Sequence, residues 1–182
     1  MKKNIIIALL AILIGGFVQA QEVKWQTIEN ASKTENTTKL YFIDFYTNWC
    51  GWCKRMDRDT FSDSTVATIL NKYYIPIKFN AEGASQFEWN SRTFTKGISV
   101  NGRPATHTFV TYVLGNKIGY PSFAIFNAEK RLLQVIPGYV KADEFAQILW
   151  YFASGSYTRL PYERYQQTFD KDIKPVMLKQ LR

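Results

Sequence analysis

The two cysteines of this 182-residue chain are separated by two residues and lie directly behind an apolar segment. That segment, Leu40–Tyr46, is rich in aromatic and β-branched residues and predicts a buried strand. The sequence Trp49-Cys50-Gly51-Trp52-Cys53-Lys54 follows, and a helix is expected over residues 51–59. A disulfide that closes so small a loop removes little freedom from the unfolded chain. The pair therefore indicates thiol–disulfide exchange rather than a structural crosslink.

The first twenty residues predict a bacterial-type signal peptide. Lys2 and Lys3 precede the unbroken apolar run Ile5–Ile14, and Val18-Gln19-Ala20 supplies the small residues that a signal peptidase recognises. The run is shorter than the roughly 20 residues that a membrane-spanning helix needs. An uncleaved anchor that also includes residues 15–18 is the alternative. We expect cleavage after Ala20, a periplasmic or secreted protein, and no stable membrane insertion afterwards.

Composition predicts a globular chain with one main domain. Hydrophobic residues make up 46% of the chain and charged residues 21%, which suits a packed core and argues against disorder. The net charge of +8 is scattered without a dense basic run, so no nucleic-acid partner is expected. We expect a domain over residues 21–154 and a helical extension or loosely docked tail over residues 155–182.

The remaining pattern predicts both helices and strands. Helical spacing is present within residues 23–32, and residues 81–118 are expected to be mostly loops, a long stretch for a compact domain. The other expected elements are a helix capped by Ser62-Asp63 and ending near Asn71, a strand over Tyr74–Asn80, a short helix within Thr106–Leu114, a hairpin of Pro121–Phe126 with Leu132–Ile136, and a helix over Ala142–Phe152.

Several segments resemble the thioredoxin superfamily. Ile43–Lys54 resembles its active-site segment, with an acidic residue six positions before the first cysteine and a Trp directly before it. Lys78-Phe79-Asn80 resembles the family's lysine-apolar-asparagine strand, and Gly119-Tyr120-Pro121-Ser122 resembles its cis-proline loop. Thr60-Phe61-Ser62-Asp63 is similar to a segment of exported thioredoxin-like thiol:disulfide interchange domains, such as the last domain of DsbD.

The resemblance covers roughly residues 25–152 and implies an α/β thioredoxin-like fold. In such a fold a central mixed β-sheet is flanked by helices. Residues 81–118 then form an insertion before the strand that follows the cis-proline. The resemblance also implies a protein thiol–disulfide oxidoreductase, for which no cofactor and no metal are expected.

The resemblance assigns a role to each cysteine. Cys50 would lie at a helix N-terminus, where unpaired N–H groups and the helix dipole favour the thiolate, the attacking nucleophile. Cys53, on the same side of the first turn, would resolve the mixed disulfide with the substrate. Together they would form the redox-active disulfide.

Two further residues are candidates for moving a proton. Asp44 is the one charged residue of its strand, and its burial should raise its pKa. In the family the matching acid handles the proton of the second cysteine, with the matching lysine, here Lys78, nearby. We therefore place Asp44 and Lys78 in the catalytic set. The alternative is that Asp44 caps a backbone group and Lys78 faces solvent.

The candidate substrate-binding set consists of residues beside the thiols and in the cis-proline loop. A cis bond between Tyr120 and Pro121 would lay that loop beside Cys50, and Pro121 has no N–H to compete near the sulfur. Aromatic side chains next to a nucleophile can hold apolar substrates, although packing is favoured for Trp49 and substrate contact for Trp52. The complete set is Trp49, Gly51, Trp52, Tyr120 and Pro121.

Alternative functions remain open at this point. Zinc binding is disfavoured because a structural site usually has four Cys or His ligands, and His107 is the only histidine. His107 is expected at the surface or capping a helix. Reduction of substrate disulfides, with a membrane electron donor upstream, is the first choice, and oxidation or isomerisation is the second. A thioredoxin-fold binding or chaperone module is the alternative of another class.

Overall fold

The computed structural model describes residues 21–99, 102 and 105–182. The predicted signal peptide, residues 1–20, lies outside the described residues. Across the described ranges, no helix is both long and apolar enough to cross a bilayer.

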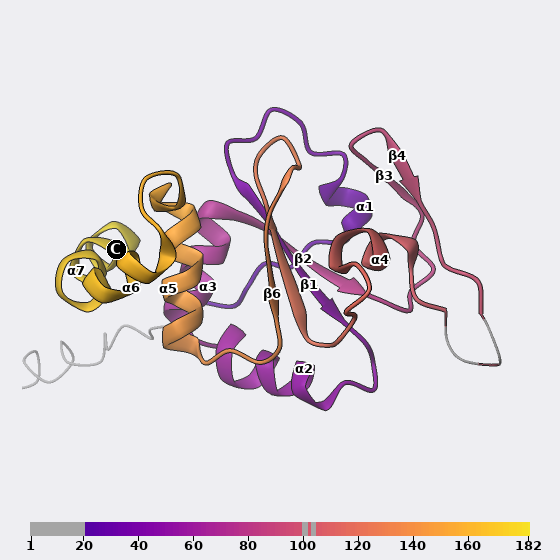
Figure 1. The fold of residues 1–182 in the computed structure, drawn as a ribbon, viewed down its shortest axis with the longest axis horizontal. Coiled ribbons are helices and arrows are strands. Elements are labelled where there is room, and N and C mark those ends of the chain that lie inside the picture. Colours follow the sequence, from indigo (N-terminus) through magenta and orange to yellow (C-terminus); the bar gives the residue numbers. More distant parts are fainter. Residues whose placement is uncertain (1–20, 100–101, 103–104) are drawn as a thin grey trace, which may run out of the picture.

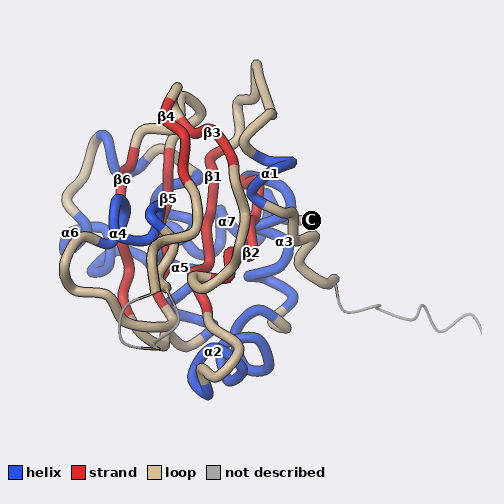
Figure 2. Tube along the Cα trace, turned by 90° about the vertical axis from the view of Figure 1, so that its right-hand side faces the viewer, coloured by secondary structure: helices blue, strands red, loops and turns tan. Residues whose placement is uncertain are grey.

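Four strands form one mixed sheet in the order β2-β1-β5-β6 (Figure 2). Strand β1 (Leu40–Tyr46) is parallel to β2 (Tyr74–Asn80) and antiparallel to β5 (Ser122–Phe126). Strand β6 (Leu132–Pro137) pairs antiparallel with β5 and forms one edge of the sheet. The strands expected from the sequence agree with these bounds to within one residue, and the predicted mixed sheet is confirmed.

Both faces of the sheet are covered (Figure 1). The covering helices are α3 (Ser64–Tyr73) and α5 (Ala142–Ala153) on one face, and α1 (Ile28–Ala31) and α4 (Thr108–Leu114) on the other. Alternate side chains of a strand point to opposite faces, so Phe42 packs with α3 and α5 while Phe45 packs with α4. Because neither face of β1 meets solvent, its acidic residue Asp44 is buried.

The segment after the cysteines begins as an α-helix and ends in a wider turn. Helix α2 (Gly51–Met56) starts directly after Cys50 and continues into a π-helical turn, η2 (Asp57–Phe61). The helix expected over residues 51–59 is therefore α-helical only in its first part. The following helix, α3, is capped by Asp63 as predicted, because the Asp63 carboxylate accepts hydrogen bonds from two N–H groups of its first turn.

The inserted segment contains a hairpin that the sequence did not predict. Strands β3 (Phe87–Trp89) and β4 (Arg92–Phe94) pair antiparallel around Asn90 and Ser91, which both have positive φ. A two-residue turn of this kind usually carries Gly at its second position, and Ser91 gives no such signal. Strands of three residues are also too short to show an alternating pattern. The predicted short helix is confirmed as α4.

His107 caps α4, one of the two predicted roles, but it is buried rather than at the surface. Its Nδ1 accepts a hydrogen bond from the Phe109 N–H at 3.1 Å, and its Nε2 lies 2.8 Å from the Ser85 carbonyl oxygen. Since Nδ1 accepts, the proton of the neutral ring is on Nε2, which donates to Ser85. Burial lowers the pKa of His107.

This arrangement of His107 predicts that the inserted segment, residues 81–118, becomes less stable at acidic pH. The folded state binds the His107 proton less readily than the unfolded chain, so stability should fall as pH drops below about 6.5, the ordinary pKa of His. The decrease in the free energy of unfolding should approach the contribution of one N-cap side chain, about 0.5–2 kcal/mol. His107→Asn, which can cap without titrating, should remove this pH dependence in urea unfolding curves measured between pH 5 and 8. An unchanged dependence in the variant would assign it to other groups.

The N-terminal arm, residues 21–27, is extended along the edge of the sheet instead of helical. The Gln26 N–H donates to the Pro76 carbonyl at 2.8 Å, and the Lys78 N–H donates to the Gln26 carbonyl at 3.2 Å. The helical spacing within residues 23–32 is therefore misleading in its first half. Helix α1 occupies only residues 28–31.

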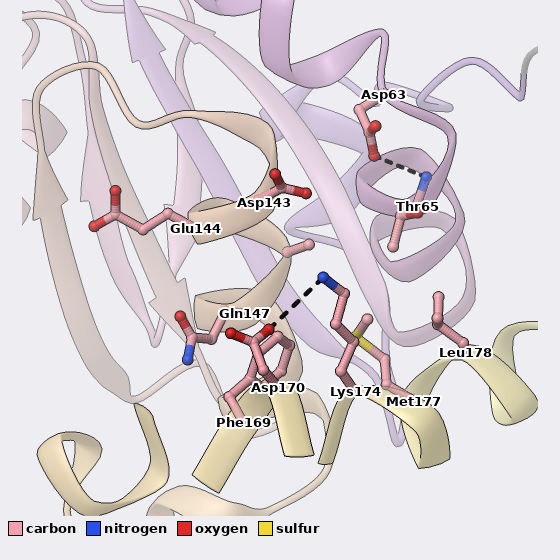
Figure 3. A pocket seen from close by; sticks show the side chains of 11 residues that line it. Asp63, Thr65, Asp143, Glu144, Gln147, Phe169, Asp170, Lys174, Met177 and Leu178 are labelled. Carbon is pink, nitrogen blue, oxygen red and sulfur yellow. Dashed lines mark hydrogen bonds and ion pairs between the residues drawn. The ribbon is translucent and has the colours of Figure 1, made fainter. Parts of the chain in front are cut away.

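The C-terminal extension, residues 155–182, packs on the outer side of α5 (Figure 1). Its elements are η3 (Ser156–Thr158), α6 (Tyr162–Thr168), η4 (Phe169–Ile173) and α7 (Lys174–Leu181). The buried side chains of Tyr165, Phe169 and Met177 belong to the same core cluster as α3 and α5. Figure 3 shows a pocket of about 240 Å³ where η4 and α7 face the start of α3 and of α5.

Candidate active site

Cys50 and Cys53 form a disulfide at the N-terminus of α2. Their Cα atoms are 5.3 Å apart, and Cys50 is the N-cap residue of the helix. The Cys50 Sγ accepts a hydrogen bond from the Cys53 N–H at 3.0 Å. When the pair is reduced, the same N–H and the positive end of the helix favour a negative sulfur at Cys50. The fold thus supplies a stabilised thiolate at the first cysteine.

The sulfurs are covered while the aromatic residues beside them are exposed. Cys50 and Cys53 are 4% and 3% exposed, whereas Trp49 and Trp52 are 66% and 54% exposed. Trp49 therefore does not pack into the core, although its ring contacts that of Tyr120. Gly51, the first residue of α2, is also exposed and has open space where a Cβ would lie. The approach to the disulfide is consequently lined by aromatic surface.

The inserted segment and the cis-proline loop both hold Trp49. Its indole N–H donates to the Glu82 carboxylate at 3.0 Å, and its ring lies 6.1 Å from that of Tyr120 in an edge-on contact. The Tyr120–Pro121 peptide bond is cis, as the resemblance implies. The Gly138 N–H donates to the Pro121 carbonyl at 2.8 Å, which ties this loop to the end of β6.

Trp52 contacts a different loop. Its ring lies 5.6 Å from that of Tyr139, and the Arg55 guanidinium lies 5.1 Å from the Trp52 ring centre and 5.2 Å from the Tyr139 ring centre. Such cation–π contacts stabilise the arrangement of both rings. Trp49 with Tyr120 and Trp52 with Tyr139 therefore form two aromatic pairs around the start of α2. Tyr139 and Arg55 are absent from the sequence prediction because no local pattern connects them with Trp52.

Asp44 and Lys78 form an ion pair, so the alternative of a solvent-facing Lys78 is wrong. The two residues lie directly opposite each other in the β1–β2 pair, and the Lys78 Nζ is 2.6 Å from the Asp44 Oδ2. Asp44 is 1% exposed, and its second oxygen, Oδ1, has no hydrogen-bond partner among the described residues. A buried carboxyl with one free oxygen has a place to accept a proton.

The environment shifts the acidity of both partners. Burial raises the pKa of Asp44 to about 6, although the nearby Lys78 ammonium opposes this rise. Burial by itself would lower the pKa of Lys78, but the attraction of the Asp44 and Asp57 carboxylates outweighs it and raises that pKa. Near neutral pH, Lys78 is therefore charged. The pKa of Asp44 lies close to that pH, so its carboxyl can both gain and lose a proton.

Asp57, a third charged residue of this site, was missed by the sequence analysis. Its carboxylate also binds the Lys78 Nζ, from the first position of η2. Asp57 follows Cys53 by four residues, and residues four apart share one face of a helix. This spacing could have indicated that Asp57 lies on the same side of the helix as the second cysteine. Within the described ranges, no group of three or more His, Cys, Asp and Glu side chains could hold a metal ion.

A protein-family model described as a thioredoxin-like domain matches residues 26–153, well over half of the chain. The chain belongs to the thioredoxin-like domain family. Within the matched residues, this thioredoxin-like chain carries the Cys50–Cys53 pair at the start of α2. The fold class predicted from the resemblance is confirmed.

Two curated relatives of this thioredoxin-like protein are named thiol:disulfide interchange protein DsbD. The one from Ralstonia nicotianae is 30% identical over 103 residues, which are 52% of this chain and 16% of the relative. The one from Photorhabdus laumondii is 41% identical over 80 residues, which are 44% of this chain and 13% of the relative. The matched part thus spans only a small share of either relative.

A solved structure supports the fold alone. The thioredoxin-fold protein from Helicobacter pylori is 15% identical to this chain and superposes with a TM-score of 0.54. The match covers 81% of this chain and 89% of that protein.

Proposed function

We propose that this thioredoxin-like protein reduces disulfides in protein substrates by exchanging them with its own Cys50–Cys53 pair. The observation that carries the proposal is the placement of this pair at the start of α2, with Cys50 as the N-cap. A dithiol in that position combines a favoured thiolate with a neighbour able to resolve the mixed disulfide.

The exchange proceeds in two steps that begin from the reduced dithiol. The Cys50 thiolate attacks one sulfur of the substrate disulfide, forms a mixed disulfide and expels the other substrate sulfur as a thiolate. Cys53 then gives its proton to the Asp44 carboxylate and attacks the Cys50 sulfur. This releases the second substrate thiolate and leaves the enzyme disulfide. Two electrons pass to the substrate, so a dithiol donor has to reduce the pair again.

The proposed substrate site lies around the exposed aromatic residues. Trp49 and Trp52 present apolar surface beside the disulfide, and Gly51 leaves room in front of it. The loop of Tyr120 and Pro121 contacts Trp49, so an extended substrate segment can lie between that loop and the start of α2. Partners of this site are proteins that contain disulfides or thiols.

The proposed cellular setting is the periplasm. Residues 1–20 would direct export and be removed, residues 21–154 would form the redox domain, and residues 155–182 would form its extension. The two curated relatives are named for thiol:disulfide interchange, which supports exchange with protein thiols and disulfides. The electron donor would be a membrane protein. Export and the donor are both part of the proposal.

The direction of electron flow is tested by the reduction potential. Equilibration of the pair with mixtures of reduced and oxidised glutathione should give a value close to the roughly −270 mV of thioredoxin. The mature protein should then also reduce insulin with dithiothreitol as the donor. A potential near the roughly −120 mV of a strong oxidant would assign the protein to disulfide formation instead.

A further inference from the structure

The N-terminal arm is fixed over the outer side of the Asp44–Lys78 pair. Besides its bonds along β2, the Lys24 N–H donates to the Asn71 side chain at 2.8 Å, and that side chain donates to the Glu22 carbonyl at 2.8 Å. These bonds attach the arm to the end of α3 as well as to the edge of the sheet. Trp25 is thereby held at a defined place above Lys78.

Three aromatic rings surround the Lys78 ammonium. The Nζ atom is 4.8 Å from the ring centre of Trp25, 5.0 Å from that of Phe61 and 5.5 Å from that of Tyr46. Trp25 also packs edge-on against Phe61 at 4.9 Å. Ring faces attract a cation and favour the charged form of a lysine. The rings come from the arm, from η2 and from β1, so only that of Trp25 lies outside the sheet and the active-site helix.

The charged groups of this site differ in their access to water. Asp44, on β1, is buried beneath Lys78, whereas the side chain of Asp57, on η2, is 47% exposed. A cavity of about 460 Å³ opens beside them, lined by the arm, Asp57, Phe61 and Lys78. The other titratable groups that face Lys78 or this cavity are Tyr46 and Glu22. Lys78 thus separates a buried carboxylate from a solvated one.

We propose that Trp25 is a positioning residue that holds the Lys78 ammonium against Asp44 and so sets the pH at which Asp44 accepts the proton of Cys53. This inference rests on the proposed function. It extends the site from the active-site strand to the N-terminal arm. Lys78 acts in it as a fixed cation, and the proton moves between Cys53 and Asp44.

The direction of the effect follows from what each contact stabilises. Without the ring of Trp25, one of the three rings around the Lys78 ammonium is gone, and the ammonium can shift away from Asp44 while it stays paired with the solvated Asp57 carboxylate. The Asp44 carboxylate is then attracted less strongly by the Lys78 ammonium, so the charged form of Asp44 is less favoured. Water that enters the space left by the ring reaches Lys78 first, because Asp44 lies buried beneath Lys78. Removal of the ring should therefore raise the pKa of Asp44.

The test compares Trp25→Leu with wild type in two measurements. The first is the titration of the Asp44 carboxyl followed by carbon NMR, and the second is the pH profile of Cys53 attack on a mixed disulfide. Both midpoints should move upward by about half a pH unit, the size expected from the loss of one cation–π contact. Lys24→Gln, an exposed change on the same arm, is the matched control and should leave both midpoints unchanged.

A double-mutant cycle with Lys78→Met decides whether Trp25 acts through the lysine. In the Lys78→Met background, Trp25→Leu should cause no further shift. An equal shift in both backgrounds, or no shift in wild type, overturns the proposal. If the Leu variant does not fold, Trp25→Phe carries the test, with a smaller shift in the same direction. Failure of wild type to reduce insulin would overturn the proposed function, while the NMR titration still tests the position of Lys78.

Discussion

Replacement of Cys50 by serine is expected to abolish insulin reduction by the mature protein. The loss should be at least on the order of a thousandfold, because a serine hydroxyl at this position cannot form the mixed disulfide on which turnover depends. The measurement is the rate of insulin precipitation with dithiothreitol as the donor. Asp143→Asn, an exposed change at the start of α5, is a control and should retain full turnover.

Cys53→Ser should stop the reaction one step later. Cys50 can still attack the substrate, but no second thiol remains to resolve the product. The variant should therefore accumulate mixed disulfides through Cys50, visible as adducts that disappear under reducing conditions. Equal turnover by wild type and Cys50→Ser would refute the oxidoreductase proposal, and the absence of adducts through Cys50 in the Cys53→Ser variant would favour a binding module.

The second large effect is expected for Asp44→Asn. A positioned general base usually contributes about 10²–10⁴-fold, so the attack of Cys53 on the mixed disulfide should slow by at least about a hundredfold at pH 7. In wild type this step should accelerate as pH rises through about 6, where Asp44 becomes a carboxylate. The variant should lose that rise. Stopped-flow release of a chromogenic thiol from the mixed disulfide measures both properties.

The same substitution should stabilise the oxidised protein at alkaline pH. Because burial raises the pKa of Asp44 to about 6 from an ordinary value of 3.8, the folded state binds more protons than the unfolded chain between these values. Wild-type stability therefore falls as pH rises through this window. Asp44→Asn resembles the protonated acid and should be about 1–3 kcal/mol more stable at pH 8, with little difference near pH 4. Urea unfolding at both pH values measures the difference, and a less stable variant at pH 8 would contradict this account.

Much of the central sheet could be predicted because its signals are local. Strand β1 is buried on both faces and is therefore a continuous apolar run, and a Pro, Gly or capping residue marks the ends of several neighbouring elements. The pairing of Asp44 with Lys78 followed from the resemblance, and the register of β1 with β2 explains it. The position of the disulfide at a helix start was predicted in the same way.

Contacts between distant segments could not be predicted from the sequence. Trp25 meets Lys78 only because the arm runs along the edge of β2, and an extended arm has no periodic pattern. Trp49 looked like a packing residue because the aromatic surface of a site cannot be told from a core by composition. Glu82 and Tyr139 lie in loops whose paths are determined by the whole fold.

The docked C-terminal extension has a consequence for shortened versions of the chain. The rings of Tyr151 and Phe152 on α5 contact Tyr157 in the extension, and Tyr151 also contacts Tyr165. A chain cut after Ser154 would leave this aromatic surface open to water and prone to association. Residues 21–154 contain every residue proposed for the chemistry, but residues 155–182 complete the core around α5. The catalytic unit and the autonomous folding unit therefore have different boundaries.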